Sequence, residues 1–133
     1  MADFVDTNVL VYSIDPDDLD KQVDAQRLLD DESLVISSQV LSEFVAVVRR
    51  RFPETFTWSE CGVAVRSFSR LRCVAVDAPL VRAALEIAGR NLLSYWDALI
   101  LAAAARAGCE RLLTEDLDEG STIAGVLIIN PFT

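Results

Sequence analysis

The sequence predicts a three-layer α/β/α domain in which helices cover both faces of a parallel sheet of about five strands. Short, almost wholly apolar runs alternate along the 133 residues with longer segments whose apolar residues recur at helical spacing. The short runs lack the polar alternation of a sheet that is half exposed to water, so we expect both faces of the sheet to be buried. The length and the 52% hydrophobic content suit one packed domain over residues 1–133.

The first half of the chain predicts two strands and three helices. A strand over residues 4–6 ends in a polar turn at residues 7–8, and a helix follows over residues 17–31. A second strand covers residues 34–36. Ser37 or Ser38 can cap the next helix, which runs to about Arg51. A helix that starts at Thr57 or Ser59 then reaches Phe68.

The second half predicts three further strands and two helices. The strands are expected over residues 73–76, 112–113 and 126–129, and the helices over residues 79–90 and 95–107. The run from Ala98 to Ala105 has no polar side chain on any face, which predicts a central, buried helix. At eight residues it is too short to cross a bilayer, which needs about 20.

Composition excludes several kinds of site. The chain has no His, so it contains neither a Ser-His-Asp nor a Cys-His nucleophile, nor the usual zinc ligands. Cys61, Cys73 and Cys109 form no CxxC pair and are interpreted as small core residues of a cytoplasmic protein. No basic start precedes an apolar segment, so nothing predicts export. The net charge of −9 disfavours a nucleic-acid partner, although two bound divalent ions would reduce it to −5.

Carboxylates interrupt apolar stretches at Asp6, Glu43, Asp97 and Asp116, with Asp118 as a fifth candidate. Burying several carboxylates side by side is costly unless a cation accompanies them. Two of these acids follow predicted strands, and in a parallel sheet such positions meet at one edge. Each acid also has an ordinary interpretation: a turn former at Asp6, a surface glutamate, a Ser94–Asp97 capping box, and an acidic loop.

Oxygen ligands of this kind select Mg²⁺ or Mn²⁺ over zinc or copper. One or two such ions turn a bound water into hydroxide and stabilise the leaving oxygen in phosphodiester hydrolysis. The carboxylates together therefore predict a metal-dependent hydrolase. Whether one or two ions bind stays open.

Four segments resemble the motifs of PIN-domain ribonucleases: residues 4–12, 41–44, 94–100 and 113–117. The tail over residues 125–132 is similar to that of VapC-type toxins from bacterial toxin–antitoxin pairs. The resemblance covers the whole chain, with all motifs in order. It implies an endoribonuclease dependent on Mg²⁺ or Mn²⁺, a cognate VapB-type antitoxin that inhibits it, a homodimer and a hetero-oligomer with the antitoxin.

The resemblance also implies roles for single residues. Asp6, Glu43, Asp97 and Asp116 become catalytic metal ligands, with Asp118 as an auxiliary ligand. The polar side chains that would orient them are Thr7, Asn8 and Thr114. The run Arg49, Arg50 and Arg51 supplies candidates for RNA phosphate contacts, or simply a solvated helix end.

Two other classes stay open. A phosphatase of haloacid-dehalogenase type would also place an Asp after the first strand, but it would need a second Asp where Asn8 stands and a catalytic lysine other than Lys21. A catalytically silent PIN-fold module that binds a protein is the second alternative. RNA turnover that requires a metal ion would separate the enzyme from the binding module.

Overall fold

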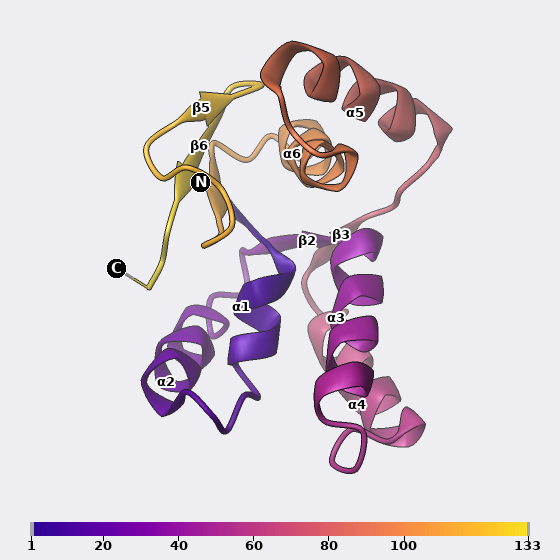
Figure 1. Ribbon diagram of the computed structural model, residues 1–133, viewed down its shortest axis with the longest axis vertical. Coiled ribbons are helices and arrows are strands. Elements are labelled where there is room, and N and C mark those ends of the chain that lie inside the picture. The colour runs from indigo at the N-terminus through magenta and orange to yellow at the C-terminus, as the bar shows by residue number, and fades with distance from the viewer. Residues whose placement is uncertain (1, 133) are drawn as a thin grey trace.

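The computed structural model describes residues 2–132 (Figure 1). Within them lie six strands and six helices. In chain order these are β1 (Asp3–Val5), α1 (Thr7–Tyr12), α2 (Leu19–Leu28), β2 (Val35–Ser37), α3 (Ser38–Arg51), α4 (Trp58–Phe68), β3 (Arg72–Val74), α5 (Ala78–Asn91), α6 (Tyr95–Arg106), β4 (Arg111–Leu113), β5 (Thr122–Ile123) and β6 (Val126–Ile129).

The strands form one sheet in the order β3-β2-β1-β4-β6-β5. β1 lies at its centre, where Phe4 pairs in parallel with Val35 of β2 and Leu112 of β4. β2 and β3 lie on one side of β1, and β4, β6 and β5 lie on the other. The strand order therefore changes direction between β1 and β4, and the carboxyl ends of these two strands form the switch point at which α/β sheets place their sites. The predicted parallel sheet is confirmed for five strands.

β5 is a sixth strand that the sequence analysis did not predict. It pairs antiparallel with β6, Thr122 with Leu127 and Ile123 with Val126. The two linking residues, Ala124 and Gly125, have φ of 53° and 78°. Two positive φ values in a two-residue loop are the geometry that closes a tight hairpin.

Helices cover both faces of the sheet, which confirms the three-layer prediction. Figure 1 shows α5 and α6 on one side of the strands and α1, α2, α3 and α4 on the other. Every residue of α6 from Ala98 to Ala104 is buried, as the apolar run predicted. Its first turn is capped by Ser94, whose Oγ accepts from the Asp97 backbone N–H at 3.1 Å.

The turn predicted at Thr7 and Asn8 is instead the start of α1. The Asp6 side chain caps this helix by accepting from the Thr7 backbone N–H at 2.7 Å. The next residues, Val9, Leu10 and Val11, are buried. A six-residue helix whose interior is entirely apolar gives no helical periodicity, so pattern alone could not distinguish it from the end of a strand.

The cysteine prediction holds for two of the three residues. Cys61 and Cys109 are buried, whereas Cys73 is exposed on the edge strand β3, so its assignment to the core was wrong. In the part of the chain that the structure describes, no helix combines the length and the apolarity needed to span a membrane.

Candidate active site

The site begins where β1 and β4 end side by side. The Asp6 backbone N–H donates to the Leu113 carbonyl at 3.1 Å, which extends the β1–β4 pairing by one residue. Asp6 and Thr114 therefore meet, and the Thr114 hydroxyl donates to Asp6 Oδ2 at 2.9 Å. Both side chains are buried.

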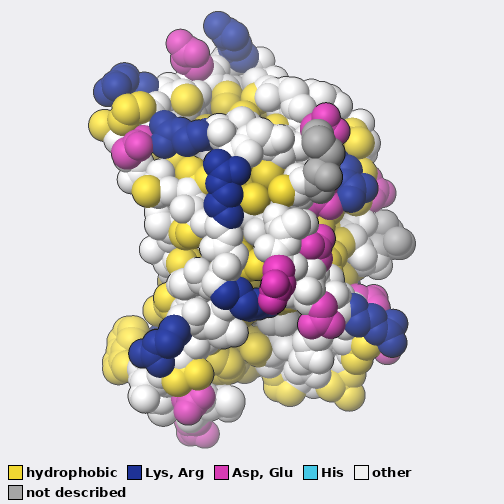
Figure 2. Space-filling view, turned by 180° about the vertical axis from the view of Figure 1, so that it is seen from behind, with side chains coloured by type: hydrophobic (Ala, Val, Ile, Leu, Met, Phe, Trp, Pro, Cys, Tyr) yellow, Lys and Arg dark blue, Asp and Glu magenta, His cyan; other side chains and the backbone are white. Residues whose placement is uncertain are grey.

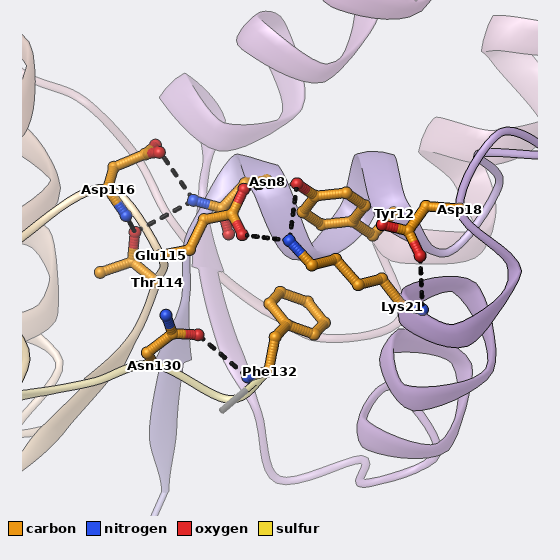
Figure 3. Close-up of polar contacts among 9 residues, drawn as sticks. All are labelled: Asn8, Tyr12, Asp18, Lys21, Thr114, Glu115, Asp116, Asn130 and Phe132. Atoms are coloured by element: carbon orange, nitrogen blue, oxygen red, sulfur yellow. Dashed lines mark hydrogen bonds and ion pairs between the residues drawn. The ribbon is translucent and has the colours of Figure 1, made fainter.

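The Thr114 hydroxyl also accepts two hydrogen bonds. The Asn8 side-chain amide and the Asp116 backbone N–H both donate to Thr114 Oγ1 at 3.0 Å. The same Asn8 nitrogen donates to Asp116 Oδ2 at 3.0 Å (Figure 3). With both lone pairs used, the hydroxyl proton of Thr114 is committed to Asp6. The predicted orienting role of Asn8 and Thr114 thus has a contact for each residue.

Burial raises the pKa of the Asp6 carboxyl to about 6. The bonds from Thr7 and Thr114 pull this pKa down, while the charges of Asp116 and Glu43 push it further up. Asp116 and Glu43 therefore each lie near enough to Asp6 for their charges to repel its carboxylate. This is the electrostatic pattern expected of acids arranged around a cation.

Glu43 reaches the site from α3, with each carboxylate oxygen held by one donor. Thr7 Oγ1 donates to Glu43 Oε2 at 3.3 Å, and Gln39 Nε2 donates to Glu43 Oε1 at 2.6 Å. Gln39 also donates to the Trp96 carbonyl at 3.1 Å and so joins α3 to the start of α6. Sequence analysis missed Gln39, although its spacing of four residues from Glu43 places both on one helix face.

Asp97 and Asp118 are not among the charges that raise the pKa of Asp6. Asp97 is half-buried in the first turn of α6, and Asp118 is exposed in the loop after β4. Across residues 2–132, no three acidic or Cys side chains lie close enough together to hold a metal ion as they stand. The acids that the structure brings together are Asp6, Glu43 and Asp116.

Glu43 and Asp116 line a cavity of about 230 Å³, and the buried Asp6 is not among its lining residues. It is lined by Thr7, Asn8, Val11, Tyr12, Glu43, Val47, Arg51, Glu115 and Asp116. A larger cavity of about 620 Å³ shares Glu43 with it and reaches Gln39 and Trp96. Every candidate metal-ligand atom here is a hard oxygen. One of them, Asn8 Oδ1, is buried without a hydrogen-bond partner among the described residues. The chemistry of this donor set fits Mg²⁺ or Mn²⁺.

The three consecutive arginines have different surroundings. Arg49 donates to the carbonyls of Pro53 and Phe56 at 3.0 and 2.8 Å, which fixes the end of α3. Arg50 is exposed. Arg51 lines the small cavity and pairs with Asp15 at 3.0 Å.

A second ion pair lies beside the same cavity. Lys21 Nζ is 3.0 Å from Glu115 Oε2 and 3.3 Å from the Tyr12 hydroxyl, and that hydroxyl donates to Glu115 Oε1 at 2.5 Å (Figure 3). The hydrogen bond to Glu115 raises the pKa of Lys21 above its ordinary value, so this amine stays protonated. None of this cluster was predicted, because Lys21 and Glu115 are far apart in the sequence.

A family model described as the PIN domain matches residues 4–121. The chain belongs to the PIN domain family. No curated protein sequence matches it. The family assignment agrees with the four motif segments, all of which begin within the matched range.

Solved structures share the fold of this PIN domain. The Mycobacterium tuberculosis toxin VapC20, described as cleaving the sarcin-ricin loop, is 23% identical with a TM-score of 0.68, covering 86% of this chain and 91% of its own. A toxin–antitoxin complex from Klebsiella pneumoniae is 18% identical with a TM-score of 0.71, covering 96% of both chains. VapBC2 from Rickettsia felis, bound to a promoter DNA fragment, is 21% identical with a TM-score of 0.68, covering 96% and 97%.

Proposed function

We propose that this PIN domain is an endoribonuclease, the toxin of a toxin–antitoxin pair, and that it hydrolyses RNA phosphodiester bonds with Mg²⁺ or Mn²⁺. The observation that carries the proposal is that Glu43 and Asp116 line one cavity and that the charges of both act on the buried Asp6 at the switch point of the sheet. The similar fold of a toxin that cleaves an RNA loop supports the choice of RNA over other phosphodiesters.

Asp6, Glu43 and Asp116 would hold the ion, with Asp97 approaching from the start of α6 and Asp118 as an auxiliary ligand. The ion would supply an activated water and would stabilise the leaving oxygen. The chain's own groups prepare the carboxylates. Each oxygen of Asp6 accepts one bond, from Thr7 or Thr114, and keeps a lone pair for a cation.

The remaining carboxylates are oriented in the same way. Thr7 and Gln39 fix the two oxygens of Glu43, and Asn8 holds one oxygen of Asp116. Oriented ligands of this kind lose little freedom when an ion binds. The polar contacts therefore serve ligand positioning as well as folding.

A cognate VapB-type antitoxin is the partner that the fold suggests, because similar structures are described as toxin–antitoxin complexes. We propose that it inhibits cleavage and that the toxin forms a homodimer. Exposed apolar side chains are available for both contacts: Trp58 is 70% exposed and Trp96 is 62% exposed. Burying such aromatic surface is the usual source of interface stability.

The phosphatase alternative has lost its support, because the chain belongs to the PIN domain family and Lys21 is engaged by Glu115 and Tyr12. The silent binding module differs from the enzyme only in turnover. Cleavage therefore decides between the two.

The test is cleavage of total cellular RNA by the purified, antitoxin-free protein with Mn²⁺, with Mg²⁺ and with EDTA. We expect endonucleolytic products only with a divalent ion. Asp6→Asn and Asp116→Asn should each lower kcat/KM by more than about a hundredfold. Asp30→Asn removes the same charge from an exposed position in the turn after α2 and should retain activity. Products that form equally in EDTA, or no products with any ion, would overturn the proposal.

A further inference from the structure

An RNA strand must approach an acidic pocket on a protein of net charge −9. Figure 2 shows one face of the molecule, where the basic side chains mostly lie apart from one another among acidic, hydrophobic and uncharged ones. Some arginines are engaged elsewhere: Arg106 pairs with Asp77, and Arg111 pairs with Asp3. Binding to a phosphate backbone depends on cations near the strand, so the basic groups beside the pocket are decisive.

Arg51 is the basic residue among those that line the acidic cavity. It stands at the end of α3, on the same helix as Glu43. One guanidinium nitrogen, Nη2, lies 3.0 Å from Asp15 Oδ2, and the group packs over the Phe52 ring at 4.8 Å. Asp15 is buried and holds the guanidinium in place. A guanidinium has five N–H donors, so this contact leaves several for a phosphate.

Lys21 occupies the corresponding place on the other side of α1. Its ammonium bonds Glu115 and Tyr12, both of which line the cavity, and it sits over the rings of Tyr12 and Phe132 at 4.6 and 5.6 Å (Figure 3). These contacts use two of its three donors. In Figure 1, α1 lies between α2, which carries Lys21, and α3, which carries Arg51.

We infer that Arg51 and Lys21 bind backbone phosphates of the RNA on the two sides of the bond that is cut, so that the strand crosses α1 over Asn8 and Tyr12. The inference rests on the proposed function. Both cations are held by carboxylates, which spares the strand the cost of ordering two long side chains. The contacts are to phosphate and so give affinity and register without reading sequence.

The experiment measures the affinity of a fluorescent single-stranded RNA for the full chain in EDTA, as KCl is varied. A phosphate contact contributes about 0.7 to the slope of log K against log salt for a single strand. Arg51→Gln and Lys21→Gln should each reduce the size of that slope by about 0.7. Arg90→Gln on α5, on the opposite face of the sheet, should leave the slope unchanged.

Two double variants separate a local contact from net charge and from folding. Lys21→Gln with Glu115→Gln, and Arg51→Gln with Asp15→Asn, remove each cation together with its carboxylate and keep the net charge at −9. Each double variant should lose as much slope as the matching single variant. The conservative variants Lys21→Arg and Arg51→Lys should keep the slope of the wild type. With Mn²⁺, the single variants should raise KM and keep most of kcat.

Each outcome decides the inference. Slopes equal to that of the wild type in both single variants, or an equal loss in Arg90→Gln, would overturn it, as would double variants that bind like the wild type. RNA cleavage by the wild type with those results would leave the proposed function standing. Salt-dependent binding through Arg51 and Lys21 without any cleavage would instead support a silent RNA-binding module.

Discussion

At the scale of single residues, the Thr114 hydroxyl determines how Asp6 behaves. It accepts from Asn8 and Asp116 and must donate to Asp6, so the Asp6 carboxyl is an acceptor at Oδ2 in this arrangement. Without these bonds, burial beside two other acids would raise the pKa of Asp6 further. Thr114 thus keeps a buried carboxylate ionisable near neutral pH, where a metal ion can use it.

Asp6 should make stability depend on pH in a predictable direction. Its folded pKa of about 6 lies above the ordinary value of 3.8, so the ionised group opposes folding above pH 6. That cost is lost as the pH falls through 6 toward 4, and it amounts to roughly 3 kcal/mol. In EDTA, the stability of Asp6→Asn relative to the wild type should therefore increase as pH rises from 4 to 8. One lost hydrogen bond lowers the stability of the variant by about 1 kcal/mol at every pH.

Urea melts of the two proteins at pH 4, 5, 6, 7 and 8 measure this difference. The exposed Asp30→Asn variant is the control, and its difference from the wild type should stay nearly constant across that range. A constant difference for Asp6→Asn as well would show that Asp6 titrates in the folded protein as it does in the unfolded chain.

At the scale of elements, the long helices could be predicted from the sequence, whereas the shortest helix and strand could not. The long apolar run of α6 and the Ser-capped α3 could be read from sequence, because periodicity and caps act locally. α1 and β5 could not. α1 is six residues long and depends on Asp6 as its cap, and β5 has two residues and exists through its pairing with β6. The hairpin loop was also hard to predict, because Ala124 adopts a positive φ that is usual for Gly or Asn.

The same limit applies to the site. Single acids were recognisable because each interrupts an apolar stretch, and Asp6 and Asp116 follow neighbouring strands whose pairing places them together. Gln39, Lys21 and Glu115 carry no such signal. Gln39 contacts the Trp96 carbonyl on α6, and Lys21 of α2 contacts Glu115 after β4, so only the contacts between elements reveal these roles.

Gln39 should act as a positioning residue between α3 and α6. Gln39→Met removes the bonds to Glu43 and to the Trp96 carbonyl, but it also removes Oε1, which is buried without a partner among the described residues. Losing two bonds and one unsatisfied acceptor should change stability by only about 1 kcal/mol. Glu43 would lose its orientation, so kcat should fall by roughly 10- to 100-fold.

Cleavage rates and melting temperatures of Gln39→Met and of Gln22→Met, the same change on α2, measure this split. Gln22→Met should leave kcat near that of the wild type. If Gln39→Met loses stability and activity in proportion, Gln39 serves folding alone.

At the scale of the whole molecule, charge connects stability to function. The chain carries −9, and part of that charge is concentrated where Asp116 and Glu43 repel the buried Asp6. Net charge of one sign keeps a protein soluble but opposes the compact state. In the free protein, charge repulsion should therefore oppose folding most strongly at this site, and any ligand that brings positive charge there should stabilise the whole fold.

Mn²⁺ should accordingly raise the melting temperature of the free protein. A ligand that binds only the folded state at 100 times its Kd contributes about 2.7 kcal/mol, a shift on the order of 10 °C for a domain of this size. The shift should shrink at pH 5, because protons compete for Asp6 below its pKa of about 6. Asp116→Asn should lose most of the shift, and Asp30→Asn should keep it. Thermal melts at pH 7.5 and pH 5, with NaCl at matched ionic strength in place of Mn²⁺, separate binding from screening. An equal shift in NaCl, or in Asp116→Asn, would mean that the ion acts on the surface charge at large and that these carboxylates do not hold it.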